Sequence, residues 1–598
     1  LEEDEIDKER GVILSEKMSR DSVSYRLMEK QFAEILPGSL ITERFPIGTE
    51  DVIKAAPRDR FVDLYTRFYT PARMTFIVVG DIDAKEMQAK IETTFGSMTN
   101  PSTPGPDPDL GAIKQPEGIK AAVFADKEVS STDVSLTMIR PYVEKPDTAA
   151  VRAERMMLDI AHSIISRRFE RLSKVEGSAI GSGSASDTVL FNYAELGSID
   201  ITAANDRWQE VVPILEQEFR RALEHGFTEA ELAEVKSNLL NAYEQQVKQK
   251  PTRKSEGIAT VLARSINDNS VFSDPVTNLE LAKRALDGID ASECHRALKT
   301  FWQAPEVSGY HLVLTTKEKP EGAETELAAL FEESRGKPVE APAAREVVPF
   351  GYTGFGKPGT VTSRKDVKDM PMLDSFANAV FEGGGLGKHS NDELQQILAG
   401  KNVSSSLAIG EDAFTIGGST VPADFTLQVQ LMCATLTDPG YRNEGLWQFQ
   451  KAIPEIYQQL KYTPAGPHQE MQAWLFGGDS RFAVAPEAKL ASYTINDAKK
   501  WITPELAKGY MELSIVGDFE IDKILPDLLA TFGALPARAA APAALADARK
   551  VQFPNAPGIK NFTYESKVPQ GIATTIWKTA GIRGNQKEFR RLNILGEI

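Results

Sequence analysis

The chain has 598 residues, a formal net charge of −17 and only two cysteines, Cys294 and Cys433. At roughly 150 residues per domain this length allows three or four domains, and 41% hydrophobic with 26% charged residues is ordinary for a globular protein. So acidic a surface repels nucleic acid and anionic membranes, and we expect neither as a partner. Two distant cysteines cannot build a disulfide framework or a cysteine metal site. The longest apolar runs are too short to cross a membrane.

The two ends of the sequence look like cuts. It begins at Leu1 rather than methionine, inside an acidic stretch that is typical of a helix. Its last residues, 590–598, stop within an apolar-periodic pattern that has no helix stop signal. We therefore expect the sequence to be a portion of a longer chain, in which any signal peptide would precede Leu1.

The stretch Asp7–Glu16 (DKERGVILSE) is the first that could carry chemistry. Glu9 and Glu16 are seven residues apart, nearly two helical turns, so a helix places them on one face. Ile13 lies between them on roughly the same face, which predicts that both carboxylates lie beside packed surface. This arrangement suits a metal-binding carboxylate and its neighbour. An ordinary solvated acidic helix is the alternative, since residues 2–5 are all acidic.

Two patterns repeat along the chain. Met74–Asp81 (MTFIVVGD) precedes a helical pattern that ends at Gly96, and Met511–Asp518 (MELSIVGD) precedes one that ends at Gly533. The offset is 437 at both ends (511 − 74 and 533 − 96), so the match needs no gap. A weaker third copy, Tyr310–Thr315, lies about halfway between them. Each copy predicts a buried strand, a turn and an amphipathic helix, and the long spacing indicates repeated domains rather than a solenoid.

Long helical patterns accompany these repeats. Ala149–Leu172 carries apolar residues at helical spacing, and Trp208–Leu223 and Thr228–Lys248 predict a helix pair. Thr228 can cap the second helix of the pair, with Glu231 closing a capping box. Strands mixed with paired helices indicate α+β domains.

Three proline-rich or poorly periodic stretches separate these patterns: 101–109, 334–369 and 534–548. Stiff, poorly periodic stretches of this kind fit domain boundaries, so we expect several domains along the chain.

The string ERGVILSEKMSRD at residues 9–21, followed by Tyr25-Arg26, Leu36-Pro37-Gly38 and Pro46–Glu50 (PIGTE), resembles the first catalytic domain of the pitrilysin/insulinase (M16) family of zinc metallopeptidases. The later units agree in general pattern, so the resemblance covers nearly the whole chain, and it is strongest for long bacterial members with two homologous halves. It implies an α+β fold of repeated homologous domains, each a mostly antiparallel sheet covered by helices, with the two halves forming a clamshell. It also implies that residues 1–100 are the C-terminal part of the first, catalytic domain, 101–333 the second domain, 334–370 the linker between the halves, 371–535 the third, non-catalytic domain, and 536–598 a linker with the start of a fourth domain.

The zinc motif of this family is H-x-x-E-H, and a glutamate far downstream supplies the third ligand. By position, Glu16 matches that ligand, and Glu9 matches a second acidic residue of the same helix that assists the site. None of the six histidines here has Glu or His at the required offsets. The resemblance therefore places the histidine pair and the general-base glutamate upstream of Leu1, where they would activate a water for peptide hydrolysis. Substrate-binding residues cannot be assigned.

The resemblance implies a Zn²⁺-dependent endopeptidase that hydrolyses peptides inside a clamshell chamber, located in the periplasm like similar bacterial proteins. Because the histidine pair is absent, we predict that this chain alone neither hydrolyses peptides nor binds zinc tightly. Two alternatives stay open: a non-catalytic scaffold, like the core subunits of processing complexes, and a relative that binds peptides without cleaving them. The sequence gives no indication of an oligomeric state.

The third domain carries a second copy of the family's motif region. Its motif positions are Asp374, Ala377 and Asn378. Alanine cannot act as a base and asparagine is a poor zinc ligand, so this unit resembles the family's non-catalytic half. Gly383–Ser390 (GGGLGKHS) resembles a phosphate loop, but Glu382 and the histidine before Ser390 stand where Gly and Ser or Thr are needed, so we expect no nucleotide site.

Three arginines and two histidines have structural interpretations that involve no catalysis. Arg167, Arg168 and Arg171 predict either a solvated helix face or salt bridges. His162 and His311 stand alone in apolar surroundings, which is typical of packing residues.

Overall fold

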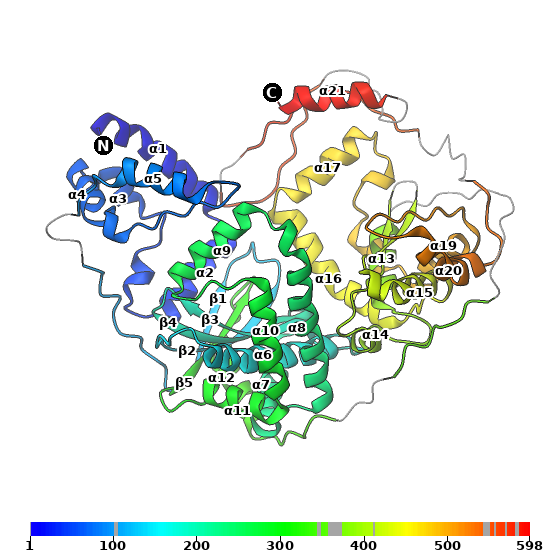
Figure 1. The fold of residues 1–598 in the computed structure, drawn as a ribbon, viewed down its shortest axis with the longest axis horizontal. Coiled ribbons are helices and arrows are strands. Elements are labelled where there is room, and N and C mark those ends of the chain that lie inside the picture. The colour runs from blue at the N-terminus through cyan, green and yellow to red at the C-terminus, as the bar shows by residue number, and fades with distance from the viewer. Residues whose placement is uncertain are drawn as a thin grey trace.

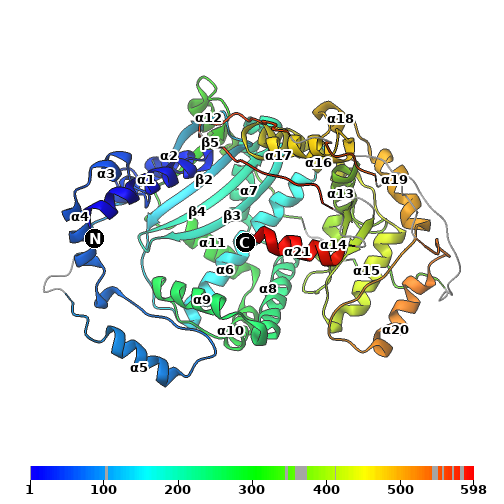
Figure 2. The same ribbon diagram turned by 90° about the horizontal axis from the view of Figure 1, so that it is seen from above.

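The computed structural model describes residues 2–100, 106–343, 348–356, 373–410, 413–541, 550–554, 558–568, 571–579 and 585–597. Three groups of elements follow one another: the N-terminal helices (residues 2–100), a central unit (106–343) built on a sheet, and a mostly helical third unit (373–541) (Figure 1). The central unit lies between the other two (Figure 2). None of the described helices combines the length and the hydropathy that crossing a membrane would need.

The N-terminal helices start with α1 (Glu3–Arg20). Its first turn is acidic and its last turn contains Lys17 and Arg20, an order of charges that favours the helix dipole. Ser22 caps the next helix by accepting a hydrogen bond from the Tyr25 N–H. The remaining elements are α2 (Val23–Ile35), η1 (Leu40–Glu43), α3 (Glu50–Ala55), α4 (Arg58–Phe68), η2 (Pro71–Arg73) and α5 (Ala84–Phe95).

The central unit contains one mixed five-stranded sheet. Its strand order is β1-β5-β2-β4-β3, with β1 and β5 parallel and the other pairs antiparallel. The sheet is therefore mostly antiparallel, and β5 confirms the strand predicted at Tyr310–Thr315. The strands are β1 (Gly118–Ala125), β2 (Thr132–Pro141), β3 (Ile180–Leu190), β4 (Ala194–Ala203) and β5 (Gly309–Thr316).

Helices pack on one face of this sheet. The predicted helices at Ala149–Leu172, Trp208–Leu223 and Thr228–Lys248 are confirmed to within a few residues, and Thr228 and Glu231 form the predicted capping box. The helices of the unit are α6 (Ala149–Ser173), α7 (Trp208–His225), α8 (Glu229–Gln249), α9 (Ser255–Asn267), α10 (Pro275–Gly288), α11 (Ala291–Trp302) and α12 (Ala323–Arg335), with 3₁₀ turns η3 (Ala204–Asp206) and η4 (Lys250–Thr252).

The alternation of side chains along β2 separates the two faces. Val134, Leu136 and Met138 are fully buried in the main hydrophobic core, which α6, α7 and α11 complete. Ser135 lies between them in sequence and points to the opposite side, because successive side chains of a strand alternate. We call this opposite side the open face. The C-terminal end of α2 packs on part of it.

Gly197 in β4 is a position where the core admits no side chain. A Cβ there would lie 2.6 Å from the Phe301 ring and 2.9 Å from the Trp302 ring. We expect Gly197→Ala to lower the free energy of unfolding by about 1–3 kcal/mol, because overpacking forces core side chains out of their preferred rotamers. Gly257→Ala in α9 is the control, since no described heavy atom lies within 4 Å of the added Cβ. Gly257→Ala should raise the free energy of unfolding by about 0.5–1 kcal/mol. Thermal unfolding measures both variants, and equal shifts in their melting temperatures would contradict the tight packing at Gly197.

The third unit is mostly helical. Its core forms around α13 and α16, where the rings of Phe376 and Phe449 meet edge to face at 5.3 Å. Its described strands form a two-stranded hairpin, β6 (Ser406–Ile409) with β7 (Phe414–Gly417). The helices are α13 (Leu373–Gly383), α14 (Asn391–Ile397), α15 (Phe425–Thr437), α16 (Asn443–Tyr462), α17 (Ala465–Leu475), α18 (Glu487–Ala491), α19 (Ile495–Lys508) and α20 (Ile521–Ala530), with 3₁₀ turns η5 (Pro422–Asp424), η6 (Ser480–Phe482) and η7 (Phe532–Ala534); α21 (Gln586–Glu597) follows near the end of the chain.

Two predicted strands are wrong. Met74–Asp81 and Met511–Asp518 form no strand in the described parts of the chain, and neither pairs with one. Phe76 is 60% exposed and Val516 is 95% exposed. A strand needs neighbours for its N–H and C=O groups, and only the copy at Tyr310–Thr315 has them, because β1 and β2 flank it. The helices predicted after both segments, α5 and α20, do form.

The central and third units contact each other through α6, α14 and α16. Asp392 at the start of α14 accepts a hydrogen bond from Arg167 of α6 at 3.0 Å. Lys451 of α16 is buried and donates from Nζ to the carbonyl oxygens of Ser173, at 2.5 Å, and Ile180, at 2.9 Å. The junction between the two units is therefore largely polar and partly inaccessible to water.

Candidate functional site

Helix α1 carries Glu9 and Glu16 on one side, as their spacing predicts. An adjoining side of α1 contacts α3. Ile6 is buried on that side, and Arg10 donates a hydrogen bond to the carbonyl oxygen of Ile53 in α3 at 2.5 Å. Both glutamates therefore flank the contact between α1 and α3 rather than take part in it.

The carboxylates of Glu9 and Glu16 do not lie beside packed surface in this chain. Glu9 is exposed, while the Glu16 side chain is 39% exposed and forms an ion pair with Arg20 one turn further on. Val12, on the same side of the helix, is 56% exposed. The packing predicted from Ile13 is thus wrong, because α1 packs on α3 through the Ile6–Arg10 side and no described segment covers the other.

The described ranges contain no group of three His, Cys, Asp or Glu side chains that could hold a metal ion. A zinc centre needs three or four such ligands. Burial raises the pKa of both Cys294 and Cys433 to about 12, which disfavours the thiolate that a metal would require. The histidines lie away from α1, in the central unit (His162, His225, His295, His311) and in the third unit (His389, His468).

Helix α13, whose sequence resembles the motif region of the family, is packed into the core of the third unit. Ala377 is fully buried beside Phe376 and Val380. The side-chain oxygen of Asn378 is buried, and it has no hydrogen-bond partner among the described residues. The side chain of Asp374 lies outside the described residues. A methyl group and a neutral amide offer neither a general base nor a zinc ligand, so nothing at these two positions supports catalysis.

The loop Gly383–Ser390 is closed on itself rather than shaped as an anion cradle. Each backbone N–H from residue 384 to 390 donates to an acceptor within the protein. Lys388 donates from Nζ to the carbonyl oxygen of Gly351 at 2.8 Å. Arg442 donates to carbonyl oxygens on the other side of the loop. Phosphate loops leave their N–H groups pointing at the ligand, so this loop serves to position α14.

The three arginines of α6 form salt bridges, and the solvated-face interpretation is wrong. Arg168 binds Glu231 through two hydrogen bonds of 2.7 and 2.9 Å. Arg167 and Arg171 share Glu234 at 2.9 and 3.1 Å. Burial acts to raise the pKa of Glu231, but the hydrogen bonds and charge of Arg168 outweigh it and lower this pKa.

His162 and His311 are core residues, as predicted. Nε2 of His162 accepts a hydrogen bond from the Trp302 indole N–H at 3.0 Å, and Nδ1 lies 3.0 Å from Asp187. The indole can only donate, so the His162 proton belongs on Nδ1. Burial lowers the pKa of His311 to about 4, which keeps this ring neutral at pH 7.

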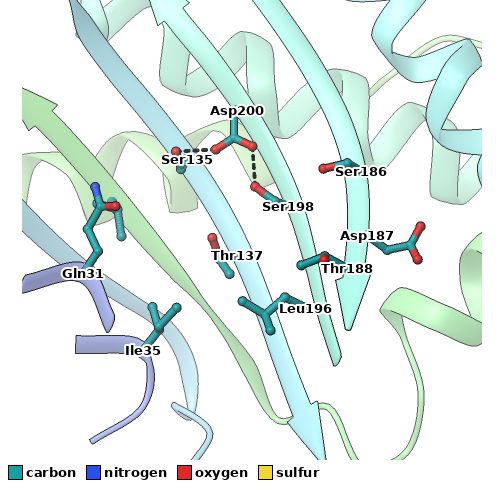
Figure 3. Close-up of a pocket in the computed structure, with 11 residues that line it drawn as sticks. Gln31, Ile35, Ser135, Thr137, Ser186, Asp187, Thr188, Leu196, Ser198 and Asp200 are labelled. Carbon is teal, nitrogen blue, oxygen red and sulfur yellow. Dashed lines mark hydrogen bonds between the residues drawn. The ribbon is translucent and has the colours of Figure 1, made fainter. Parts of the chain in front are cut away.

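Sequence reasoning missed a pocket on the open face of the central sheet. It has a volume of about 200 Å³, with β2, β3 and β4 as its floor and α2 at its side (Figure 3). The hydroxyl of Ser135 donates to Asp200 at 2.6 Å, and the hydroxyl of Ser198 donates to the other oxygen of the same carboxylate. Alternating small polar residues in both strands were a signal, but only the pairing register places Ser135 opposite Asp200.

Known proteins match both the sequence and the fold. The family described as Peptidase M16 inactive domain matches residues 55–239. The probable zinc protease PqqL of Escherichia coli is 23% identical over 540 residues, covering 83% of this chain and 57% of that protein. The chloroplastic stromal processing peptidase of Arabidopsis thaliana is 24% identical over 685 residues, covering 88% and 52%. The chain spans about half the length of these curated relatives.

Solved structures share the arrangement of the elements. The crystal structure of the periplasmic protease PqqL from Escherichia coli matches with a TM-score of 0.52 and 20% identity, covering 91% of this chain and 64% of that one. A mutant of the ferredoxin protease FusC, in complex with Arabidopsis ferredoxin, matches with a TM-score of 0.62 and 15% identity over the same shares. At these identities the likeness establishes the fold.

A helix-covered sheet unit followed by a mostly helical unit has the fold of the solved proteases PqqL and FusC. The match of residues 55–239 and the similarity over most of the chain to a probable zinc protease PqqL support the resemblance to the M16 peptidases, the pitrilysin/insulinase family. The chain is similar to the PqqL zinc proteases in sequence and in fold.

Proposed function

We propose that a longer protein containing this chain is a zinc-dependent endopeptidase that cleaves peptides within a two-half chamber. The observation that carries this proposal is the position of Glu16, on the side of α1 that α3 does not cover. Glu16 also matches the family's third zinc ligand by position, and relatives from Escherichia coli, Haemophilus influenzae and Mycobacterium leprae are named zinc proteases. Glu9, seven residues before Glu16 on the same side of α1, would assist the charge balance of the site.

The residues present do not by themselves fit a zinc ion. Glu16 offers one carboxylate, whereas a catalytic zinc takes three protein ligands and keeps one position open. The histidines of this chain lie in the central and third units, not beside α1. A histidine pair would therefore have to come from a segment outside this sequence, which would lie against the open side of α1 beside Val12. We derive no reaction step for the chain alone, and expect it to be inactive.

The partners of such a protein would be peptides, since a chamber closed by two halves admits extended chains more readily than folded domains. A periplasmic location is part of the proposal. It is supported by the PqqL structure, which is described as a periplasmic protease.

A second candidate is a scaffold or a peptide-binding protein without protease activity. The match of residues 55–239 to a family described as an inactive domain favours it in part. Ala377 and Asn378 add to this, because the third unit's copy of the motif has lost its base and ligand positions. The two candidates differ in whether zinc binds at Glu16.

Glu16→Gln in the full-length protein is the test. We expect zinc content to fall at least ~10-fold by mass spectrometry of the metal, because a neutral amide replaces an anionic ligand. Glu5→Gln is the matched control, since Glu5 is exposed on the same helix and pairs with Lys8, and it should leave zinc content unchanged. Unchanged zinc in Glu16→Gln, or a full-length protein that contains none, would reject the peptidase in favour of the scaffold.

A further inference from the structure

The pocket on the open face is built from successive rungs of the central sheet. Asp200 in β4 pairs with Ser135 in β2, and on the next rung of the same face Ser198 pairs with Thr137. Leu196 follows one rung further along β4. Figure 3 shows the carboxylate of Asp200 at one end of this floor and Leu196 toward the other. The pocket therefore has a charged end and an apolar end.

The charged end presents hydrogen-bond acceptors. Ser135 and Ser198 each donate to a different oxygen of Asp200. A hydroxyl has one hydrogen, so each serine that donates to the carboxylate has only lone pairs left for a ligand. Three acceptor groups around one negative charge require a ligand that carries several N–H donors and a positive charge.

The apolar end fits a hydrocarbon stem. Ile35 of α2 packs in one cluster with Leu196, and both line the pocket. Rungs on one face are about 7 Å apart, at roughly 3.4 Å per residue, a distance that an extended lysine side chain can bridge. A volume of about 200 Å³ lies below the roughly 300–1,000 Å³ of sites for whole small-molecule ligands, so the pocket takes one side chain.

An ammonium group fits better than a guanidinium group. Both oxygens of Asp200 already hold a serine hydroxyl, so the planar two-pronged contact that arginine makes with a carboxylate would compete with Ser135 and Ser198. The three donors of an ammonium can reach the carboxylate and both serine oxygens while these bonds stay in place.

No basic side chain is among the described residues that line the pocket, so its described lining does not neutralise Asp200. Asp133, one rung beyond Asp200 on the same face, accepts hydrogen bonds from Thr202 at 2.6 Å and Ser131 at 2.8 Å. Asp187 also lines the pocket, but its carboxylate is turned to the helix side (Figure 3), where it meets His162.

We propose that this pocket binds the side chain of a lysine in a peptide, with the ammonium group at Asp200, Ser135 and Ser198 and the stem against the apolar end. The proposal rests on the proposed function only in taking a peptide as the ligand. It assigns the central unit a preference for lysine-containing peptides, at a site that is separate from Glu16.

The test uses the 598-residue chain and fluorescein-labelled, N-acetylated peptides that are identical except for one position, which is lysine, arginine or norleucine. Binding is measured by fluorescence anisotropy. The lysine peptide should bind at least ~10-fold more tightly than the norleucine peptide, because norleucine keeps the stem and loses the charged hydrogen bonds. It should also bind more tightly than the arginine peptide. Equal affinity for lysine and norleucine would overturn the site, and a preference for arginine would overturn its ammonium assignment.

Substitutions in the pocket test whether the preference for the lysine peptide arises there. Asp200→Asn should weaken binding of the lysine peptide ~10- to 100-fold and leave norleucine binding unchanged, while Ser198→Ala, which keeps the charge, should weaken it less. Asp133→Asn is the matched control, because it removes one negative charge from the same face outside the pocket, and it should change affinity less than ~2-fold. An equal loss in Asp133→Asn and Asp200→Asn would show nonspecific attraction and refute the pocket. Binding needs neither zinc nor cleavage, so failure of the peptidase proposal would leave this result intact.

Discussion

Replacing Arg442 with alanine is expected to lower the free energy of unfolding of the third unit by about 4 kcal/mol. The guanidinium group of Arg442 lies at the start of α16 and donates to carbonyl oxygens of the loop between α13 and α14. These oxygens belong to Gly384, Leu386, Gly387 and His389. Hydrogen bonds from a charged donor contribute roughly 1.5–3 kcal/mol each, and removal of the donor leaves the acceptors unpaired.

The loop cannot easily find other donors for these oxygens. Its own N–H groups are engaged, and Gly385 holds a positive φ of 61°, a conformation that glycine adopts without strain. Loss of Arg442 should therefore loosen residues 384–397 first. Hydrogen–deuterium exchange of these residues measures the change directly, and a urea titration measures the stability.

Two other arginine variants serve as controls for Arg442→Ala. Arg442→Lys keeps the charge but has one donor nitrogen, so it should cost about half as much. Arg264→Ala removes an exposed arginine that lies 3.4 Å from Asp268, and it should change stability by less than about 0.5 kcal/mol. If Arg442→Ala were no more destabilising than Arg264→Ala, the loop would not depend on the guanidinium group.

The helices of this fold were predictable because their signals are local. The capping box of Thr228 and Glu231 and the apolar spacing of Ala149–Leu172 depend only on neighbours along the chain. Strands depend on partners that sequence does not reveal. Met74–Asp81 and Tyr310–Thr315 carry similar β-branched patterns, yet only the second has strands on both sides.

The candidate sites also differ in whether they depend on local sequence or on tertiary structure. The spacing of Glu9 and Glu16 fixes their shared side of α1, but whether that side is covered depends on segments elsewhere. The pocket at Asp200 needs the register of β2 against β4 and the placement of α2, both of which are tertiary. Sequence therefore located the residues of a single helix and missed a site that strands and a helix assemble.

The junction of the central and third units contains a buried lysine that the sequence patterns do not predict. Lys451 lies in α16, in a pattern that gives no reason to expect its burial, and its partners are two backbone carbonyl oxygens rather than a carboxylate. Burial, with a smaller contribution from the charge of Arg207, lowers the pKa of Lys451 from 10.5 to about 8. A neutral amine has two N–H donors, which match the two acceptors.

Because of this lowered pKa, we expect the destabilisation caused by Lys451→Met to grow with pH. Below pH 8 the lysine is protonated in both the folded and the unfolded chain, and folding must desolvate the charge. Between about 8 and 10.5 the unfolded chain binds more protons, so stability rises with pH in the wild type by up to about 3 kcal/mol. Methionine does not titrate and leaves the carbonyl oxygens of Ser173 and Ile180 unpaired, which costs roughly 1–3 kcal/mol each.

Urea unfolding of the wild type and Lys451→Met at pH 7 and pH 10 measures this difference. At pH 7 the loss of hydrogen bonds is partly offset by relief of the buried charge, so the variants should differ by about 1–2 kcal/mol, whereas at pH 10 they should differ by about 3–4 kcal/mol. Lys461→Met, in the same helix, is the control. A hydrogen bond with Tyr462 and the charge of Glu565 raise the Lys461 pKa above 10.5, so its contribution is lost only above that pH and should not change between 7 and 10. A constant difference between the wild type and Lys451→Met would mean that Lys451 stays charged at the junction.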